Sequence, residues 1–299
     1  MPMTTSTTST RTEGQEKKYR RMLEDIAAHA AKLALAQVQA NSEGWQRVLE
    51  HGDELKGAIA ELVVAKTREL TLSNQFADEE AQSSYAYPKG YTVRGITEQI
   101  NILRQLFPGI GFADEKLADQ PLPPNAEGWF AIPKWEKFAP TYGEAVEKVL
   151  AMIGSKRKFY NYRDGQLGAE YLRQHAKTAK MFQKLGDEQK DHDILVVPAQ
   201  FGLRHKGRSV RRAREVFTAN EFGLGAFAIG IMVLTHPERL VQWEQLHVDC
   251  AGDEFAPDAD GDFSFAPIFC FNDGEVRFYA YWYDLALEDY GSASAFVSQ

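Results

Sequence analysis

The chain has 299 residues, of which 44% are hydrophobic and 25% are charged, and its formal net charge is −8. These values are typical of a globular protein with its own hydrophobic core, and they exclude a disordered, collagen-like or disulfide-dense chain. The charge is uneven, because residues 204–214 hold six Lys or Arg and no acid, whereas residues 244–299 hold twelve Asp or Glu and one Arg.

No segment of the sequence predicts export or membrane insertion. Residues 1–12 are rich in Thr and Ser and lack the apolar region of a secretory signal, so we expect a disordered tail. The longest apolar run, residues 222–234, is shorter than the about 20 residues that a membrane span needs. The two cysteines, Cys250 and Cys270, fit a reduced, cytoplasmic protein, and the sequence leaves open whether they pair.

Two amphipathic helices are predicted near the N-terminus, over residues 16–40 and 42–70. A short joint at Asn41-Ser42 favours an antiparallel helical hairpin, which we place at residues 13–80. Apolar residues of the second helix recur every three or four positions: Trp45, Val48, Leu49, Leu55, Ile59, Leu62, Val63 and Leu70. This face either packs within the chain or, through residues 45–70, joins copies of the chain into a homo-oligomer.

Turn-forming residues come next, and they predict that residues 81–128 form a linker. Pro88-Lys89-Gly90 is typical of a turn, and the apolar spacing of residues 96–106 predicts one short helix. Residues 120–128 contain three prolines and predict an extended loop. We expect a mixed α+β domain over residues 129–299.

The first half of this domain contains four predicted elements. Residues 129–135 predict a short edge strand, because a proline interrupts their apolar run. Residues 141–154 predict a helix with a capping-box start, and residues 168–185 predict another. Residues 193–199 are rich in Val and Ile and predict a strand that is buried on both faces.

The second half leads from helices to strands. Ser209 is placed to cap a helix, and residues 226–234 predict a buried helix. Asn272-Asp273-Gly274 separates two aromatic runs, residues 263–271 and 275–284, which is typical of a β-hairpin. The fold class is therefore α+β: an N-terminal helical hairpin, then a mixed α/β domain with a C-terminal antiparallel β-hairpin. We expect one small sheet, formed by residues 193–199, 246–249 and the hairpin.

A basic loop and helix follow the strand at residues 193–199. Residues 202–209 match the spacing G-x-x-x-x-G-[K/R]-S of a phosphate-binding loop, although Arg208 stands where that motif has Lys. Guanidinium groups bind phosphate through paired hydrogen bonds, whether or not the motif is complete. We therefore expect a site for a nucleic acid or another phosphate-bearing or acidic ligand. Its residues are Arg204, His205, Lys206, Arg208, Ser209, Arg211 and Arg212.

An acidic segment, residues 249–262, is the second candidate site. Three carboxylates at alternate positions resemble those of calcium loops and are candidate ligands of Mg²⁺ or Ca²⁺: Asp258, Asp260 and Asp262. The segment departs from the EF-hand pattern, because Phe269 stands at its twelfth position. If Asp249 and Asp253 face the basic loop, the two segments form a metal-dependent phosphoryl-transfer site; otherwise the basic and acidic segments neutralise each other by packing.

Other chemical motifs are weak. Residues 223–228 match the G-x-G-x-x-A pattern of dinucleotide-binding folds, but no strand is predicted before them, so we interpret the glycines as sites of close helix packing. The patterns G-x-S-x-G, H-E-x-x-H and C-x-x-C do not occur. Three functions stay open: binding of a phosphate-bearing ligand by the basic segment, metal-dependent catalysis by residues 249–262, and assembly through the N-terminal helices.

Overall fold

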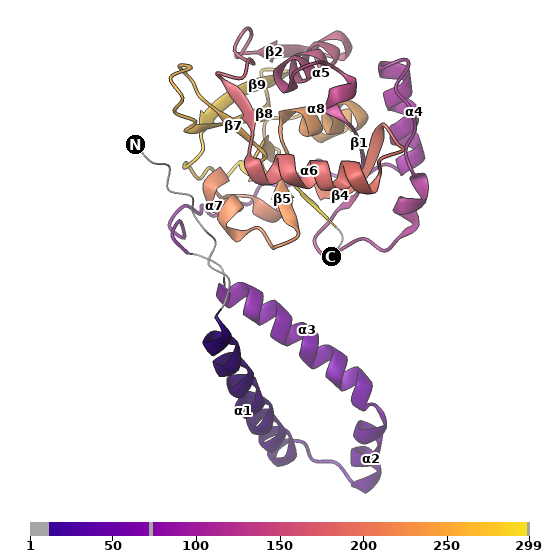
Figure 1. Cartoon of the computed structure of the whole chain (residues 1–299), viewed down its shortest axis with the longest axis vertical. Coiled ribbons are helices and arrows are strands. Elements are labelled where there is room, and N and C mark those ends of the chain that lie inside the picture. Colours follow the sequence, from indigo (N-terminus) through magenta and orange to yellow (C-terminus); the bar gives the residue numbers. More distant parts are fainter. Residues whose placement is uncertain (1–11, 72–73, 298–299) are drawn as a thin grey trace. The chain divides into compact units, whose positions relative to one another are not determined.

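The computed structural model describes residues 12–71 and 74–297, which divide into two compact units, Met1–Leu70 and Thr71–Gln299 (Figure 1). We expected the first unit to end at residue 80, but it ends at Leu70, and residues 71–80 belong to the second unit. The expected disordered tail lies outside the described residues, apart from Thr12, whose side chain caps the first helix.

The first unit is helical, as predicted. Its helices are α1 (Glu13–Gln37), α2 (Ser42–Glu50) and α3 (Gly52–Thr71). Thr12 and Gln15 form a capping box at the start of α1, and the Asn41 side chain accepts a hydrogen bond from the Gly44 amide at the start of α2. The predicted helix at residues 42–70 is broken in two at His51, directly before a glycine, which is a poor helix former.

The second unit contains the remaining helices and all the strands that the structure describes. Its helices are α4 (Ile96–Leu106), α5 (Tyr142–Lys156), α6 (Ala176–Glu188), α7 (Val210–Val216) and α8 (Ala226–Thr235). Its short 3₁₀ helices are η1 (Glu115–Asp119), η2 (Trp135–Lys137), η3 (Leu203–His205) and η4 (Pro237–Arg239). Its strands are β1 (Gly128–Pro133), β2 (Phe159–Asn161), β3 (Leu172–Gln174), β4 (Ile194–Gln200), β5 (Glu221–Gly223), β6 (His247–Asp249), β7 (Asp253–Phe255), β8 (Phe265–Asn272), β9 (Glu275–Trp282), β10 (Tyr290–Ser292) and β11 (Ser294–Phe296).

These strands form two sheets, so the expectation of one small sheet was wrong. The first sheet has the order β1-β4-β11-β5, and its pairs are antiparallel. The second has the order β10-β6-β8-β7-β3, with β9 joined to β8 and β2. The predicted strands β4 and β6 therefore belong to different sheets. In the first sheet, β4 pairs with β11 and not with the hairpin; β11 is only three residues long and was not predicted.

The core of the second unit surrounds α8. Every residue of α8 is buried, as its uninterrupted apolar sequence predicted. A Cβ atom at Gly230 would lie 2.5 Å from a methyl carbon of Val149 in α5, so the glycine permits the close approach of these two helices. The glycines of residues 223–228 also lie in close contacts, because a Cβ atom at Gly223 would lie 2.5 Å from the Ala251 carbonyl oxygen. The expectation that no strand precedes them was wrong, since β5 ends at Gly223.

The β8–β9 hairpin confirms its turn signal, because Asp273 and Gly274 both have positive φ angles, 50° and 77°, as the tightest hairpin turns require. The prediction of a helix over residues 168–185 was wrong for the first half of that range. Residues 172–174 form β3, which pairs with β7, and the helix begins only after the His175 side chain caps it.

Residues 81–128 were expected to be a linker, but they belong to the second unit. Ile100 and Leu103 of α4 are buried in its core. The fully buried Gln99 side chain accepts a hydrogen bond from the Ala131 amide and donates one to the Trp129 carbonyl, and these bonds join α4 to β1.

Among the described residues, no helix is both long enough and apolar enough to span a membrane. Cys250 and Cys270 are both buried and unpaired.

Candidate functional site

The basic helix α7 begins as the sequence predicted. The Ser209 hydroxyl accepts a hydrogen bond from the Arg212 amide, 3.0 Å away, and this bond caps the helix. Val210, Ala213 and Val216 are buried. Because these three side chains fix one side of α7 to the core, its arginines are held at defined positions.

Arg211 is held by a carboxylate from a distant part of the chain. Its Nε donates to Glu79 Oε1 at 2.7 Å, and its Nη2 also pairs with Glu79. The Ser209 hydroxyl donates to the other oxygen of the same carboxylate at 2.6 Å. Burial raises the pKa of Glu79, but the hydrogen bonds from Arg211 and Ser209 outweigh burial and hold that pKa below its usual value.

The neighbouring carboxylate holds two more arginines. Glu80 Oε1 accepts hydrogen bonds from Arg212 Nε at 2.7 Å and from Arg208 Nε at 3.2 Å. Arg212 also pairs with Glu215, with 2.8 Å between Nη1 and Oε2. We call residues 74–81, which carry Glu79 and Glu80, the acidic strap.

Backbone bonds align the acidic strap with the loop before α7. The Ala81 amide donates to the Gly207 carbonyl at 2.6 Å, and the Ser209 amide donates to the Glu79 carbonyl at 3.2 Å. Gly207 has a φ of 74°, and a Cβ atom there would overlap the Ala81 carbonyl oxygen. This glycine, which matched a phosphate-binding pattern in the sequence, instead makes room for the strap.

Two of the other predicted ligand residues, Arg204 and His205, lie around one buried carboxylate, Glu221. Its Oε1 accepts hydrogen bonds from Arg204 Nε at 3.0 Å, His205 Nε2 at 2.8 Å and Ser294 Oγ at 2.7 Å. Burial raises the pKa of Glu221, but these donors lower it to about 2. Burial lowers the pKa of His205, although its hydrogen bond to Glu221 acts in the opposite direction. Lys206 Nζ donates to the carbonyl of Tyr85 at 3.0 Å.

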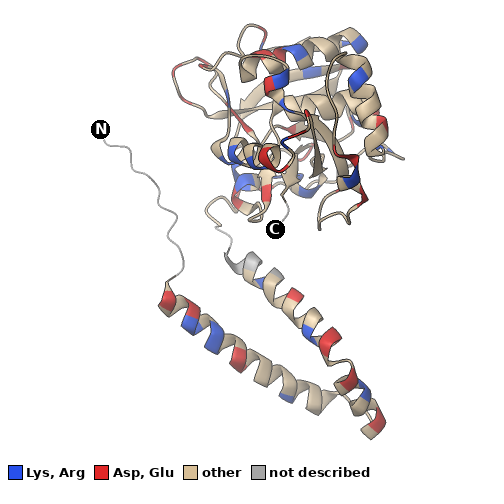
Figure 2. Ribbon diagram, turned by 45° about the vertical axis from the view of Figure 1, so that its right-hand side comes forward, with Lys and Arg blue, Asp and Glu red and all other residues tan. Residues whose placement is uncertain are grey.

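The structure therefore brings the predicted ligand residues together and also pairs them. Basic and acidic positions are interspersed over the second unit (Figure 2). The sequence suggested neutralisation by residues 249–262, but the partners are Glu79, Glu80, Glu215, Glu221 and, at 3.8 Å from Arg211, Asp284. Glu79 and Glu80 were missed because about 130 residues separate them from the arginines that they bind.

The predicted metal site does not form. All three of its carboxylates are exposed on the loop between β7 and β8: Asp258, Asp260 and Asp262. One of them, Asp260, accepts a hydrogen bond from the Asp262 amide at 2.9 Å, which is a local turn contact. Over residues 12–71 and 74–297, no group of three or more His, Cys, Asp or Glu side chains could hold a metal ion.

Asp249 and Asp253 are buried within the second unit and do not form a catalytic pair at the basic loop. Asp253 accepts hydrogen bonds from the Ala226 amide at 2.6 Å and from the Tyr142 hydroxyl at 2.9 Å, so it caps α8. Burial raises the pKa of Asp253 to about 7. Burial likewise raises the pKa of Asp249, on β6, to about 8.

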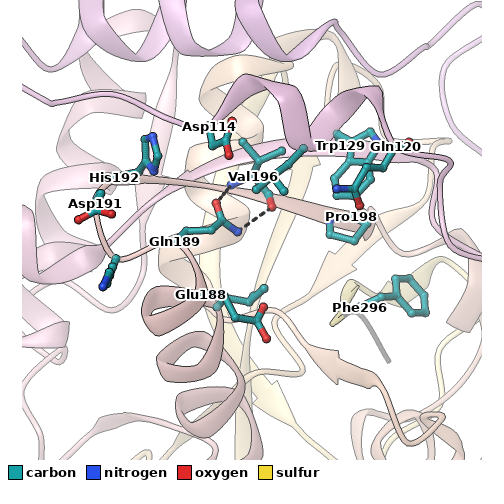
Figure 3. A pocket seen from close by; sticks show the side chains of 13 residues that line it. Asp114, Gln120, Trp129, Glu188, Gln189, Asp191, His192, Val196, Pro198 and Phe296 are labelled. Carbon is teal, nitrogen blue, oxygen red and sulfur yellow. Dashed lines mark hydrogen bonds between the residues drawn. The ribbon is translucent and has the colours of Figure 1, made fainter.

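A cleft of about 270 Å³ lies between η1, the end of α6 and β4 (Figure 3). The Gln189 side chain in it bonds both backbone groups of Val196, with 2.9 Å from the Val196 amide to Oε1. Asp114 caps η1 by accepting a hydrogen bond from the Lys116 amide. These polar groups of the cleft serve local structure, and none of the residues predicted as a ligand site lines it.

The N-terminal helices present a different kind of candidate surface. No residue of α1 or α2 is buried, and α1 and α3 lie apart along most of their length (Figure 1). The Tyr19 hydroxyl meets the Thr67 hydroxyl near one end of the pair. Among the residues whose burial the structure describes, eleven large apolar side chains of this unit are exposed, against ten in the much longer second unit. They are Met22, Ile26, Leu33, Leu35, Val38, Val48, Leu49, Leu55, Ile59, Leu62 and Val64.

Six of these exposed residues form two helical seams. Met22, Ile26 and Leu33 lie on one side of α1, four and seven residues apart, and Leu55, Ile59 and Leu62 lie on one side of α3. Apolar residues at this spacing are typical of helices that pack against other helices.

Comparison of the chain with protein-family models, with curated proteins and with solved structures finds no match.

Proposed function

We propose that this chain is an assembly protein, in which the N-terminal helices join two copies of the chain. One observation carries the proposal: the apolar seams of α1 and α3 are between 43% and 61% exposed in the single chain. Isolated helices are only marginally stable in water, and most helical stability in proteins comes from packing of an apolar face. A partner that covers these seams supplies that packing.

A second copy is the partner that fits best. It carries the same two seams on helices of the same lengths, so two copies can form a four-helix bundle with two-fold symmetry. In such a bundle each seam meets an apolar surface of matching length.

The apolar surface is sufficient for an association of moderate strength. Because each of the six seam side chains is about half exposed, covering it contributes about 1 kcal/mol. Twelve such side chains in two copies contribute about 12 kcal/mol, which is comparable with the about 4–15 kcal/mol that association costs. Val48, Leu49 and the other exposed apolar residues add to this sum. At the lower end of that cost about 8 kcal/mol remains, which corresponds to a dimer that dissociates in the micromolar range; a higher cost gives a weaker dimer.

The test is the mass of the full chain in solution, measured by light scattering over a dilution series. We expect twice the chain mass at high concentration and a shift towards the single chain on dilution. The double variant Ile59→Lys, Leu62→Lys places two charges in the α3 seam, so we expect it to remain a single chain at every concentration.

A matched control adds the same charge to the opposite side of α3. Gly57 and Ala60 are exposed and lie away from the seam, so the variant Gly57→Lys, Ala60→Lys should still dimerise. Circular dichroism checks that both variants keep their helices. A single-chain mass for the parent protein at all concentrations, or equal loss of dimer in both variants, would refute the proposal.

A further inference from the structure

The acidic strap is attached to the second unit by polar contacts. No residue from Asn74 to Gly90 is buried, so the strap contributes little to the hydrophobic core. Its main ionic attachment is through the carboxylates of Glu79 and Glu80, and two backbone bonds join it to the loop before α7. Its first residues add weaker contacts: the Gln75 and Phe76 amides donate to Glu215, the Asn74 side chain accepts from Arg212, and the Phe76 ring centroid lies 4.4 Å from the Arg211 guanidinium carbon. Segments held in this way belong to the parts of a protein that open most easily.

The helix beneath the strap does not depend on it. Val210, Ala213 and Phe217 pack with Ala251 and Ala266 in a small buried cluster. The cap of α7 also comes from its own Ser209. Release of the strap would therefore leave the arginines of α7 in place.

Release would change the local charge. With the strap in place, Arg208, Arg211 and Arg212 face four carboxylates: Glu79, Glu80, Glu215 and Asp284. Without the strap, the same three arginines face two carboxylates. The surface thus turns from net negative to net positive when the strap leaves.

The carboxylate of Glu79 is bound as a phosphate group would be. It accepts hydrogen bonds from a guanidinium group and from a serine hydroxyl, and the adjacent Glu80 bridges two further guanidinium groups. Phosphate oxygens take the same donors, and arginine pairs with them through two parallel bonds. The strap is in this sense a ligand supplied by the chain itself.

We propose that α7 and the loop before it form a binding site for single-stranded nucleic acid, which the acidic strap occupies until a strand displaces it. This site is independent of the assembly through α1 and α3.

Two observations favour a nucleic-acid strand over an acidic peptide as the displacing ligand. Arg208, just before the cap of α7, and Arg212 bind the same carboxylate, and Arg211 binds the adjacent one, so the three guanidinium groups lie together and can meet successive phosphates. Arg211 also lies 5.6 Å from the ring centroid of Tyr283, which does not belong to the strap. Aromatic side chains beside arginines are the surface on which unpaired bases stack. A strand also releases counterions on binding, a gain that the tethered strap lacks.

The test is the binding of fluorescein-labelled oligothymidylate and oligouridylate of about 20 nucleotides to the full-length chain, by fluorescence anisotropy at low salt. The double variant Glu79→Gln, Glu80→Gln weakens the strap while keeping its shape, so we expect its affinity to be at least about tenfold higher than that of the parent, because more of the population is open. Addition of Arg211→Ala to the double variant should remove this gain.

The control makes the same change of charge elsewhere. Glu147 in α5 and Asp187 in α6 are exposed and distant from the strap in sequence, so the variant Glu147→Gln, Asp187→Asn should bind as the parent does. Equal binding by the strap variant and this control would overturn the proposal. So would a gain that survives Arg211→Ala, or equal binding of a polyglutamate peptide to the strap variant.

Hydrogen exchange in the parent chain provides a test that does not depend on the folding of any variant. The amides of Ala81 and Ser209 donate the two backbone bonds of the strap. With saturating oligonucleotide at low salt, we expect both amides to exchange faster, while those inside α8 stay protected. Unchanged exchange at Ala81 and Ser209 in the bound state would overturn displacement of the strap.

Discussion

Substitution of Glu221 by Gln tests the electrostatic account of the basic loop most directly. The pKa of this carboxyl falls from 4.5 in an unfolded chain to about 2 in the fold, which corresponds to about 3 kcal/mol of stability at neutral pH. Glutamine keeps the size of the side chain but removes the negative charge that Arg204 and His205 meet. We therefore expect Glu221→Gln to lose about 3 kcal/mol near pH 7.

The pH dependence of this loss is fixed by the sign of the shift. Because the folded pKa lies below the unfolded one, the stabilisation is complete above pH 4.5 and disappears as the pH falls towards 2. The difference between parent and variant should shrink over that interval. Urea unfolding followed by tryptophan fluorescence measures it, since Trp129, Trp135, Trp243 and Trp282 all lie in the second unit.

The exposed Glu147 in α5 provides the control, and Glu147→Gln should change the free energy of unfolding by less than about 0.5 kcal/mol. A loss below about 1 kcal/mol for Glu221→Gln at pH 7, or a difference between parent and variant that does not vary with pH, would refute the reasoning.

Two further substitutions test the buried core. A Cβ atom at Gly225 would lie 2.5 Å from the Tyr142 hydroxyl oxygen, so Gly225→Ala should cost about 1–3 kcal/mol in urea unfolding. A Cβ atom at Gly154 would meet nothing closer than a Phe159 ring carbon at 3.5 Å, so Gly154→Ala should be neutral or stabilising; equal effects of the two substitutions would contradict the packing argument. Burial raises the pKa of Asp249 from 3.8 to about 8, so the folded chain holds a proton that the unfolded chain loses, and stability falls as the pH rises between these values. Asp249→Asn removes this pH dependence, so its free energy of unfolding at pH 8 should exceed that of the parent by roughly 1–3 kcal/mol. Equal free energies of unfolding at pH 8 would contradict this prediction.

The parts of the fold that depend on local signals could be predicted from the sequence. The cap of α7 by Ser209, the burial of α8 and the tight turn at Asp273-Gly274 each follow from a few neighbouring residues, and the structure confirms all three. The division of the strands into two sheets could not be predicted, because β11 is three residues long and its partners are set by tertiary pairing.

The candidate site also has a part that could be predicted from local sequence and a part that could not. The sequence predicted that Arg211 and Arg212 lie in the first turn of a helix capped by Ser209, and the structure confirms this; Arg208 lies before the cap and joins them only through Glu80. The pairing of these arginines with Glu79 and Glu80 could not be predicted, because a charge in the sequence does not specify which distant charge it meets. For the same reason, residues 249–262 were a reasonable but incorrect choice of counter-charge.

The position of β11 has a consequence for the order in which the protein matures. This strand lies between β4 and β5, yet every other strand of both sheets precedes it in the chain. Until a ribosome has released residues 294–296, both neighbours present unpaired backbone edges, which are templates for aggregation. The second unit therefore completes this sheet only after β11 emerges, and the slow, long-range closure of such a topology lengthens the time for which the edges of β4 and β5 are exposed.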